Sequence, residues 1–375
     1  MADSSIPRQQ QNWLSKRSPV QRSQTSRYLL ITLGSLAFSV SATRLFLYLA
    51  GFPQIGGGNL HIAHVLWGGL LLFIAAMLPL ILANNWAFTW SAVISGLGMG
   101  LFIDEVGKFI TSNNDYFYAS AAPIIYAFFL ITVLVTIELS ASRKNTPRGE
   151  MYAVLADLGE VLDYDLSEDE RDALLARLQP ISQLRDAPEL SRLARSLSEF
   201  LSSQETRLVP KVPTLGERLK ASWTRFEQKW LPKSNLKWLI IALMILWAGW
   251  ALFLATGYTL ASRSPEALQV FTKSFLADRV ITSDTGFDWV TARVVMQGVT
   301  GLAALIAVIL LIANKEKPGM TVAYIDMLVV LTLINLVIFY FDQFSTIFFA
   351  IPQFILLMLI ISYRGRYIRK PKWVI

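Results

Sequence analysis

The chain has 375 residues, of which 54% are apolar and only 16% are charged, whereas soluble proteins carry about 25% charged residues. This deficit excludes an ordinary soluble domain and indicates lipid as the solvent. The sequence contains no cysteine, which excludes disulfides, thiolate-bound zinc, iron–sulfur clusters and covalently attached c-type haem.

Eight apolar stretches are predicted to cross the membrane, because each reaches the roughly 20 residues that a helix needs to span a bilayer. They cover residues 28–50, 61–83, 86–110, 120–140, 238–258, 290–313, 321–341 and 344–363. The first run lacks a small-residue cleavage site, so we expect a retained span and not a secretory signal. The first four stretches form one predicted membrane unit (28–140) and the last four a second (237–363). The sequence therefore predicts an all-α membrane protein.

Clusters of Lys and Arg set the predicted orientation. They lie in the polar N-terminal tail (1–27), after the fourth span, before the fifth, between the sixth and seventh, and in the basic C-terminal tail (364–375). All five fall on one side when eight spans are drawn, which fits the excess of positive charge in cytoplasmic segments. We therefore expect a multi-pass protein with both termini in the cytoplasm. The net charge of +7 is assigned to topology and lipid headgroups, not to nucleic acid.

The segment between the two membrane units (141–236) is predicted to be a small cytoplasmic helical insertion. Residues 148–205 carry thirteen Asp and Glu against six Lys and Arg, and Ser167 followed by Glu170 is the signature of a helical capping box. Residues 215–230 are predicted to form a basic amphipathic helix in the headgroup layer. That helix either tethers the fifth span or has a regulatory role. The acidic part is a candidate surface for a cytoplasmic protein partner.

The two membrane units resemble each other in sequence. Residues 63–69 align with 292–298, Asp104 aligns with Asp342, and Pro123 aligns with Pro352. Each unit begins and ends on the same side, so the pattern predicts two parallel four-helix repeats related by an axis along the membrane normal. Such repeats occur in transporters, whose sites often lie between the halves.

Ionisable residues inside spans cost roughly 2.5–3.5 kcal/mol each near the bilayer centre on insertion scales, and they mark functional sites by default. Here they gather at the predicted outer ends of several spans. The candidates for a substrate or ion site are Arg44, Asp104, Glu105, Lys108, Asn114, Asp115, Arg293 and Asp342.

Structural explanations for several of these residues stay open. Lys108 can form an intrahelical pair with Asp104 or Glu105, and the long side chain of Arg44 can extend toward water. A further acid, Asp326, is expected to be a helix-end residue on the cytoplasmic side of the seventh span.

The two histidines suggest a metal. His61 and His64 are three residues apart, so both rings leave one helix face and could bind a divalent metal together with a carboxylate. The alternative is a pair of solvated residues at the mouth of a helix.

One part of the sequence resembles a known group of proteins. The pattern His61-x-x-His64, followed by the run Phe102-Ile-Asp-Glu-Val-Gly-Lys-Phe109, is similar to a group of uncharacterised bacterial integral membrane proteins. The resemblance covers about the first 140 residues. It implies a bacterial inner-membrane location and brings no activity with it.

Three classes of function remain. The first is a transporter or channel-like protein with a polar site on the extracytoplasmic side. The second is a non-catalytic assembly or signalling protein. The third is a metal-dependent membrane-embedded hydrolase, in which His61, His64 and a nearby acid hold the metal. The sequence favours the first and leans away from an enzyme, and it does not indicate an oligomeric state.

Overall fold

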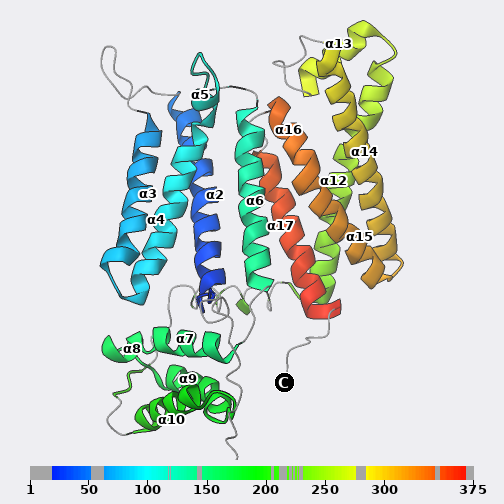
Figure 1. Cartoon of the computed structure of the whole chain (residues 1–375). Coiled ribbons are helices and arrows are strands. Elements are labelled where there is room, and N and C mark those ends of the chain that lie inside the picture. The colour runs from blue at the N-terminus through cyan, green and yellow to red at the C-terminus, as the bar shows by residue number, and fades with distance from the viewer. Residues whose placement is uncertain are drawn as a thin grey trace, which may run out of the picture. The chain divides into compact units, whose positions relative to one another are not determined.

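The computed structural model describes residues 19–51, 63–116, 118, 120–141, 146–203, 207–210, 231–275, 284–342 and 347–368, with single residues between 218 and 227. The described residues form helices and connections without a strand. Eight of their helices are long and apolar enough to cross a membrane, as predicted (Figure 1).

The first four of these helices differ from the predicted spans mainly at the third. The structure has α2 (Thr25–Ala50), α3 (His64–Ile81), α4 (Asn85–Asp104) and α6 (Ala121–Ala141). The predicted third span runs to residue 110, but α4 ends at Asp104 and a short helix, α5 (Val106–Ile110), follows after Glu105. The backbone of Glu105 turns away from helical geometry, with φ −92° and ψ 11°, which places the charged residues at a break between two helices.

Of the second four helices, the first three are longer than the predicted spans and the last is shorter. They are α12 (Lys233–Ala261), α14 (Asp284–Ile312), α15 (Glu316–Val329) with its continuations η1 (Val330–Ile334) and α16 (Asn335–Asp342), and α17 (Ile347–Tyr363). A π-helical turn, η3 (Arg364–Ile368), follows α17, and η1 is a second π-helical segment inside the seventh span. The sequence analysis did not predict η1 or the helix α13 (Pro265–Phe275). Apolar side chains of α12, α14, α15 and α17 form one buried core.

The segment after α6 folds into four short helices, namely α7 (Pro147–Asp157), α8 (Gly159–Leu162), α9 (Glu168–Ser182) and α10 (Pro188–Ser202). The predicted capping box is confirmed: the backbone N–H of Ser167 donates to Glu170 Oε2 at 2.9 Å, and Ser167 Oγ accepts from the N–H of Glu170. Met151, Val154, Leu174 and Leu178 belong to the apolar core of this module. The predicted amphipathic helix at 215–230 lies largely outside the described residues.

Contacts divide the chain into two compact units. The first comprises residues 1–34, 73–95 and 134–212, and the second comprises residues 35–72, 96–133 and 213–375. In the first unit, Asn84 between α3 and α4 donates to both carboxylate oxygens of Asp163 at 3.0 and 3.1 Å, and Asn85 donates to the carbonyl of Ala156 at 3.2 Å. The module is therefore attached to the connection between α3 and α4. Four of the predicted substrate or ion site residues form ion pairs with one another among the described residues, and all four lie in the second unit: Arg44, Asp104, Glu105 and Lys108.

Candidate functional site

Asp104, the last residue of α4, is the centre of a charged cluster in the second unit. Its side chain is fully buried, and Arg44 of α2, also buried, donates from Nε to Oδ1 and from Nη2 to the Asp104 backbone carbonyl at 2.9 Å. The hydroxyl of Tyr116 donates to Oδ2 at 2.9 Å. The Arg44 guanidinium also lies over the Tyr116 ring, 4.2 Å from its centroid. Both charges of this pair are thus removed from solvent and satisfied by several bonds.

Tyr116 follows α5 and lies outside the spans. Burial, and then the negative charge of Asp104, raise the pKa of its phenol above the usual value. Tyr116 therefore stays protonated and remains a donor to Asp104.

His64, the first residue of α3, bridges the two acids of the cluster. Its Nε2 lies 3.0 Å from Asp104 Oδ2, and its Nδ1 lies 2.9 Å from Glu105 Oε1. A neutral imidazole carries one N–H, so it can donate to only one of two carboxylates. Asp104 is compensated by Arg44 and Glu105 by Lys108, which favours both acids as carboxylates. The two contacts are therefore satisfied together when the ring is an imidazolium.

Glu105 uses its two carboxylate oxygens unequally. Its side chain is 1% exposed, and Oε1 receives the backbone N–H of His64 at 3.2 Å and Lys108 Nζ at 3.2 Å in addition to the ring nitrogen. Oε2 is buried and has no hydrogen-bond partner among the described residues. Buried acceptors are rarely left unsatisfied. Among the buried side-chain atoms of the cluster, only Glu105 Oε2 is thus without a hydrogen-bond partner in the described part of the chain.

The loop after α5 folds back and delivers Tyr116. The N–H of Asp115 donates to Thr111 Oγ1 at 2.7 Å, and Asn114 adopts a left-handed backbone with φ 54°, which Asn tolerates better than most residues. Gly107 allows the close return, because a Cβ there would lie 2.7 Å from the carbonyl oxygen of Asp115. Asn114, a predicted site residue, is exposed and has its clear role in this turn.

Small residues bring the helices of the cluster together. A Cβ on Gly68 of α3 would lie 2.8 Å from the backbone nitrogen of Phe102 and 2.9 Å from the carbonyl oxygen of Gly98, both on α4. Gly100 of α4 packs in the same way on Ser39 of α2, whose hydroxyl donates to the carbonyl of Leu97 at 2.9 Å. Close backbone approach at small residues is the usual way in which spans pack. It fixes α2 and α3 against α4, and so fixes Arg44 and His64 against Asp104.

The structure brings together five of the predicted residues: Arg44, His64, Asp104, Glu105 and Lys108. Asp115 contributes backbone bonds to the adjoining loop. Arg293 is buried on α14, a helix that provides none of the contacts described above. Asp342 ends α16, and its side chain and all of His61 lie outside the described residues.

Tyr116 was missed as a site residue. The sequence signal was present, because this tyrosine follows the polar Asn113-Asn114-Asp115 turn directly after the charged run.

The described residues include no group of three or more His, Asp and Glu side chains arranged to hold a metal ion. Both ring nitrogens of His64 are directed at carboxylates instead, which leaves no lone pair for a metal. The divalent metal bound through His61 and His64 stays a prediction that these contacts do not favour.

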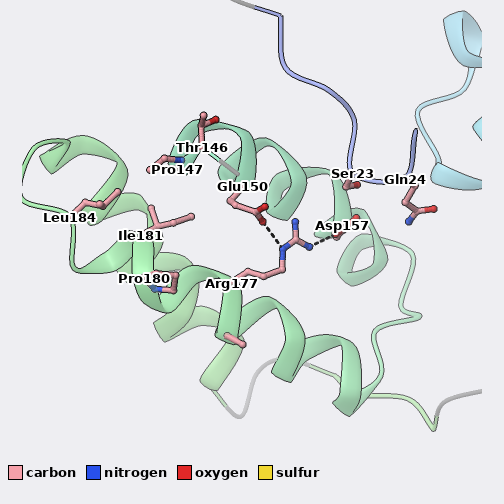
Figure 2. Close-up of a pocket in the computed structure, with 11 residues that line it drawn as sticks. Ser23, Gln24, Thr146, Pro147, Glu150, Asp157, Arg177, Pro180, Ile181 and Leu184 are labelled. Carbon is pink, nitrogen blue, oxygen red and sulfur yellow. Dashed lines mark hydrogen bonds and ion pairs between the residues drawn. The ribbon is translucent and has the colours of Figure 1, made fainter. Parts of the chain in front are cut away.

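A second candidate lies in the helical module of the first unit. A cavity of about 740 Å³ is bordered by Arg177, Glu150 and Asp157, together with Ser23, Gln24, Thr146, Pro147, Ala176, Pro180, Ile181 and Leu184. Arg177 donates from Nε to Glu150 at 3.1 Å and from Nη1 to Asp157 at 2.7 Å (Figure 2). Two acids thus offset the one cation, so the cavity does not have the charge of an anion site.

Comparisons with known proteins give no relative from which a role can be carried over. No protein-family model, no curated protein and no solved structure matches this chain.

Proposed function

We propose that this protein is a transporter or channel-like membrane protein, and that the charged cluster of Arg44, His64, Asp104, Glu105, Lys108 and Tyr116 is its proton-controlled site. The cluster would lie on the extracytoplasmic side of a bacterial inner membrane. The distribution of Lys and Arg supports that orientation. The bonds from Asn84 and Asn85 to the module agree with the predicted order of spans, in which the α3–α4 connection and the segment after α6 lie on the same side, whichever side that is.

The observation that carries the proposal is the bridge made by one imidazole between two buried carboxylates. His64 is 23% exposed, whereas Asp104 and Glu105 are 0% and 1% exposed. A proton can therefore exchange between water and the ring while both acids stay buried. Loss of that proton would turn one attractive contact into a contact between two acceptors. The link between α3 and the break after α4 would then weaken, which is a physical means of opening the site.

Glu105 Oε2 supports a ligand at the same place. Within the charged cluster it is the buried oxygen that has no hydrogen-bond partner among the described residues, so a donor group of a substrate would satisfy it. Arg44 and Lys108 offset the charges of Asp104 and Glu105, so the net charge of the cluster is that of the histidine proton. Such a site favours small polar solutes that carry a hydrogen-bond donor over apolar ones.

Currents on a solid-supported membrane test the proposal. Liposomes containing the protein would be exposed to a pH jump and to a panel of inorganic cations, anions and amino acids. We expect at least one of these probes to evoke a current that is at least tenfold smaller in His64→Gln and unchanged in Glu150→Gln, a variant of the module. Wild-type protein that responds to no probe, or a His64→Gln protein with the wild-type current, would contradict the proposal.

One observation favours the second class of function, a non-catalytic assembly or signalling protein. The module exposes large apolar side chains at Tyr152, Leu155, Leu162 and Tyr164, with Leu162 79% exposed, and exposed apolar patches commonly mark binding surfaces. A photo-reactive residue at Leu162 should then crosslink in cells to one defined protein. Crosslinking to lipid alone would remove this alternative.

A further inference from the structure

A buried acid in the second half of the chain is not part of the charged cluster. Asp326 lies in the last turn of α15, which continues without a gap into η1 and α16, and it is on the buried face that also carries Gly319, Ala323 and Val330. Its side chain is 3% exposed, and neither carboxylate oxygen has a hydrogen-bond partner among the described residues. The expectation that Asp326 is a helix-end residue was wrong, because η1 and α16 continue the helical span from α15 to Asp342.

The surroundings of Asp326 are apolar. The face on which it lies joins the core formed with α12, α14 and α17, which contains Met244, Met320, Met327 and Ile360. The helices that share this core or pack on α15 carry several charged and titratable groups among the described side chains. They include Lys233, Lys237 and Tyr258 on α12, Arg293 on α14, Tyr363 on α17, Arg364, Arg366 and Tyr367 on η3, and Glu316, Lys317 and Tyr324 on α15 itself.

Several of these groups are engaged with partners other than Asp326. Lys233 and Lys237 pair with Glu316 at 2.9 and 3.9 Å, Arg364 lies over the ring of Tyr324, and Arg366 pairs with Glu227 at 3.0 Å. None of the ion pairs within the described residues includes Asp326. An ionised carboxylate without a partner is strongly disfavoured in such an environment, so Asp326 is expected to hold a proton.

The turn that follows Asp326 is unusual. The N–H of Val330 donates to the carbonyls of both Asp326 and Met327, and the π-helical segment η1 begins at that residue. The hydroxyl of Tyr126 from α6 donates to the carbonyl of Leu331 inside η1. One turn further, Asn335 Nδ2 donates to Gln353 Oε1 of α17 at 2.7 Å. Polar groups thus continue from Asp326 along the same helix, and π-helical turns inside spans are frequent at functional sites.

We propose that Asp326 is a proton-binding site in the second set of helices, and that the π-helical turn η1 is the adaptable element through which its proton exchanges with water. The ligand is a proton and not a metal ion. A metal ion needs several oxygen ligands, and the described residues contain no group of three acids and histidines placed to supply them. The inference does not depend on the proposed transport function, because it concerns protonation and not flux.

Infrared difference spectroscopy on the full-length protein in lipid nanodiscs tests this directly. Wild-type protein at neutral pH should show the C=O band of a protonated carboxyl group that Asp326→Asn removes. The band should shift when H₂O is replaced by D₂O. An Asp172→Asn variant is the control, because that side chain is 66% exposed and paired with Arg171. It should leave the band unchanged.

A chemical probe gives a second readout. Dicyclohexylcarbodiimide enters membranes and adds to protonated carboxyl groups, so mass spectrometry should find its adduct on Asp326 and not on Asp104, which is paired with Arg44. The yield should fall at least tenfold when η1 is made regular by deleting Thr332, provided that variant remains folded by circular dichroism. Absence of the band at neutral pH overturns the proposal. So does a band that neither shifts in D₂O nor is accompanied by labelling, since the carboxyl would then be sealed from water.

Discussion

At the scale of single side chains, Asp104 holds the charged cluster together, because Arg44, His64 and Tyr116 all converge on its carboxylate. Asp104→Asn would leave the buried guanidinium of Arg44 without its counter-charge. Removal of one partner of a buried ion pair typically costs about 3–5 kcal/mol. We expect a loss of that size in the free energy of unfolding, measured by denaturation of the purified protein in detergent.

The control is a substitution in the ion pair between Arg177 and Glu150, which is partly exposed to solvent. Glu150→Gln removes one of two acids from Arg177, whose side chain is 28% exposed. Pairs of that kind contribute up to about 1 kcal/mol. Equal losses of stability in the two variants would show that the Asp104 pair is not buried as described.

A pH dependence is expected in the helical module. Burial, followed by the charges of Glu170, Asp157, Asp165 and Asp163, raises the pKa of Glu160 from 4.5 to about 7. Between these two values the folded module binds more protons than the unfolded chain, so its stability falls as the pH rises through that window and is constant above it. Glu160→Gln should remove this fall and stabilise the module at pH 8 by on the order of 1 kcal/mol, after discounting for solvent screening.

The test measures amide hydrogen exchange of α8 and α9 in the intact protein. The exchange rates are corrected for the intrinsic chemical rate at each pH. Wild-type protection should be higher at pH 5.5 than at pH 8, and the variant should show no such difference. Protection that increases with pH in the wild type would reverse the sign and contradict the assignment to Glu160.

The sequence predicted the charges of the cluster but not its connections. The pair between Glu105 and Lys108 follows from spacing within one turn of helix. The bonds from Arg44 and His64 to Asp104 join residues 60 and 40 positions apart, and they depend on how each helix is rotated about its axis. Spacing along the chain does not fix that rotation. For the same reason the bridge by His64 could not be predicted, and the bond from Tyr116 depends on how the loop after α5 folds back.

At the scale of helices, contact between α3 and α4 depends on Gly68. Gly68→Ala would place a methyl group 2.8 Å from the backbone of Phe102, and backbone atoms cannot move aside as a flexible side chain can. Overpacking of this kind costs typically about 1–3 kcal/mol. We expect a loss of that size in thermal stability, together with a changed environment of His64.

The neighbouring glycine provides the control. A Cβ on Gly69 meets nothing within 4 Å, and alanine has the better helix propensity, so Gly69→Ala should be neutral or slightly stabilising. If both variants behave alike, the close contact between α3 and α4 is not formed in the membrane.

Some elements could have been predicted and others could not. The start of α13 has a local signal that was not used, because Ser264 precedes Pro265 and Glu266 and its hydroxyl accepts from the N–H of Ala267. The π-helical turn η1 has the ordinary apolar sequence Val-Leu-Thr-Leu-Ile. One of its carbonyls, that of Leu331, accepts from the hydroxyl of Tyr126, which lies 205 positions away in the chain, so a contact of this turn is not visible in any local pattern.

At the scale of the whole molecule, the number of spans was the most predictable feature, since length and apolarity alone determine it. The sides of the membrane and the parallel repeat stay predictions. A chain without cysteine is suited to testing the sides, because single cysteines can be introduced without background. Cysteines at Ser112 and Ser264 should react with an impermeant maleimide in intact cells, and one at Ser203 should react only after lysis. Labelling of the Ser203 variant in intact cells would exclude the proposed orientation.

We infer that His64 is an imidazolium held between Asp104 and Glu105. The chain has two histidines, so His61→Gln leaves His64 as the sole imidazole. Nitrogen-15 nuclear magnetic resonance of the histidine-labelled variant in lipid then reports on this ring alone. We predict that both ring nitrogens carry protons at neutral pH, and that the added change Glu105→Gln leaves one of them unprotonated. A neutral ring in the His61→Gln protein, with one nitrogen free of a proton at neutral pH, would show that His64 is not held as an imidazolium between the two acids.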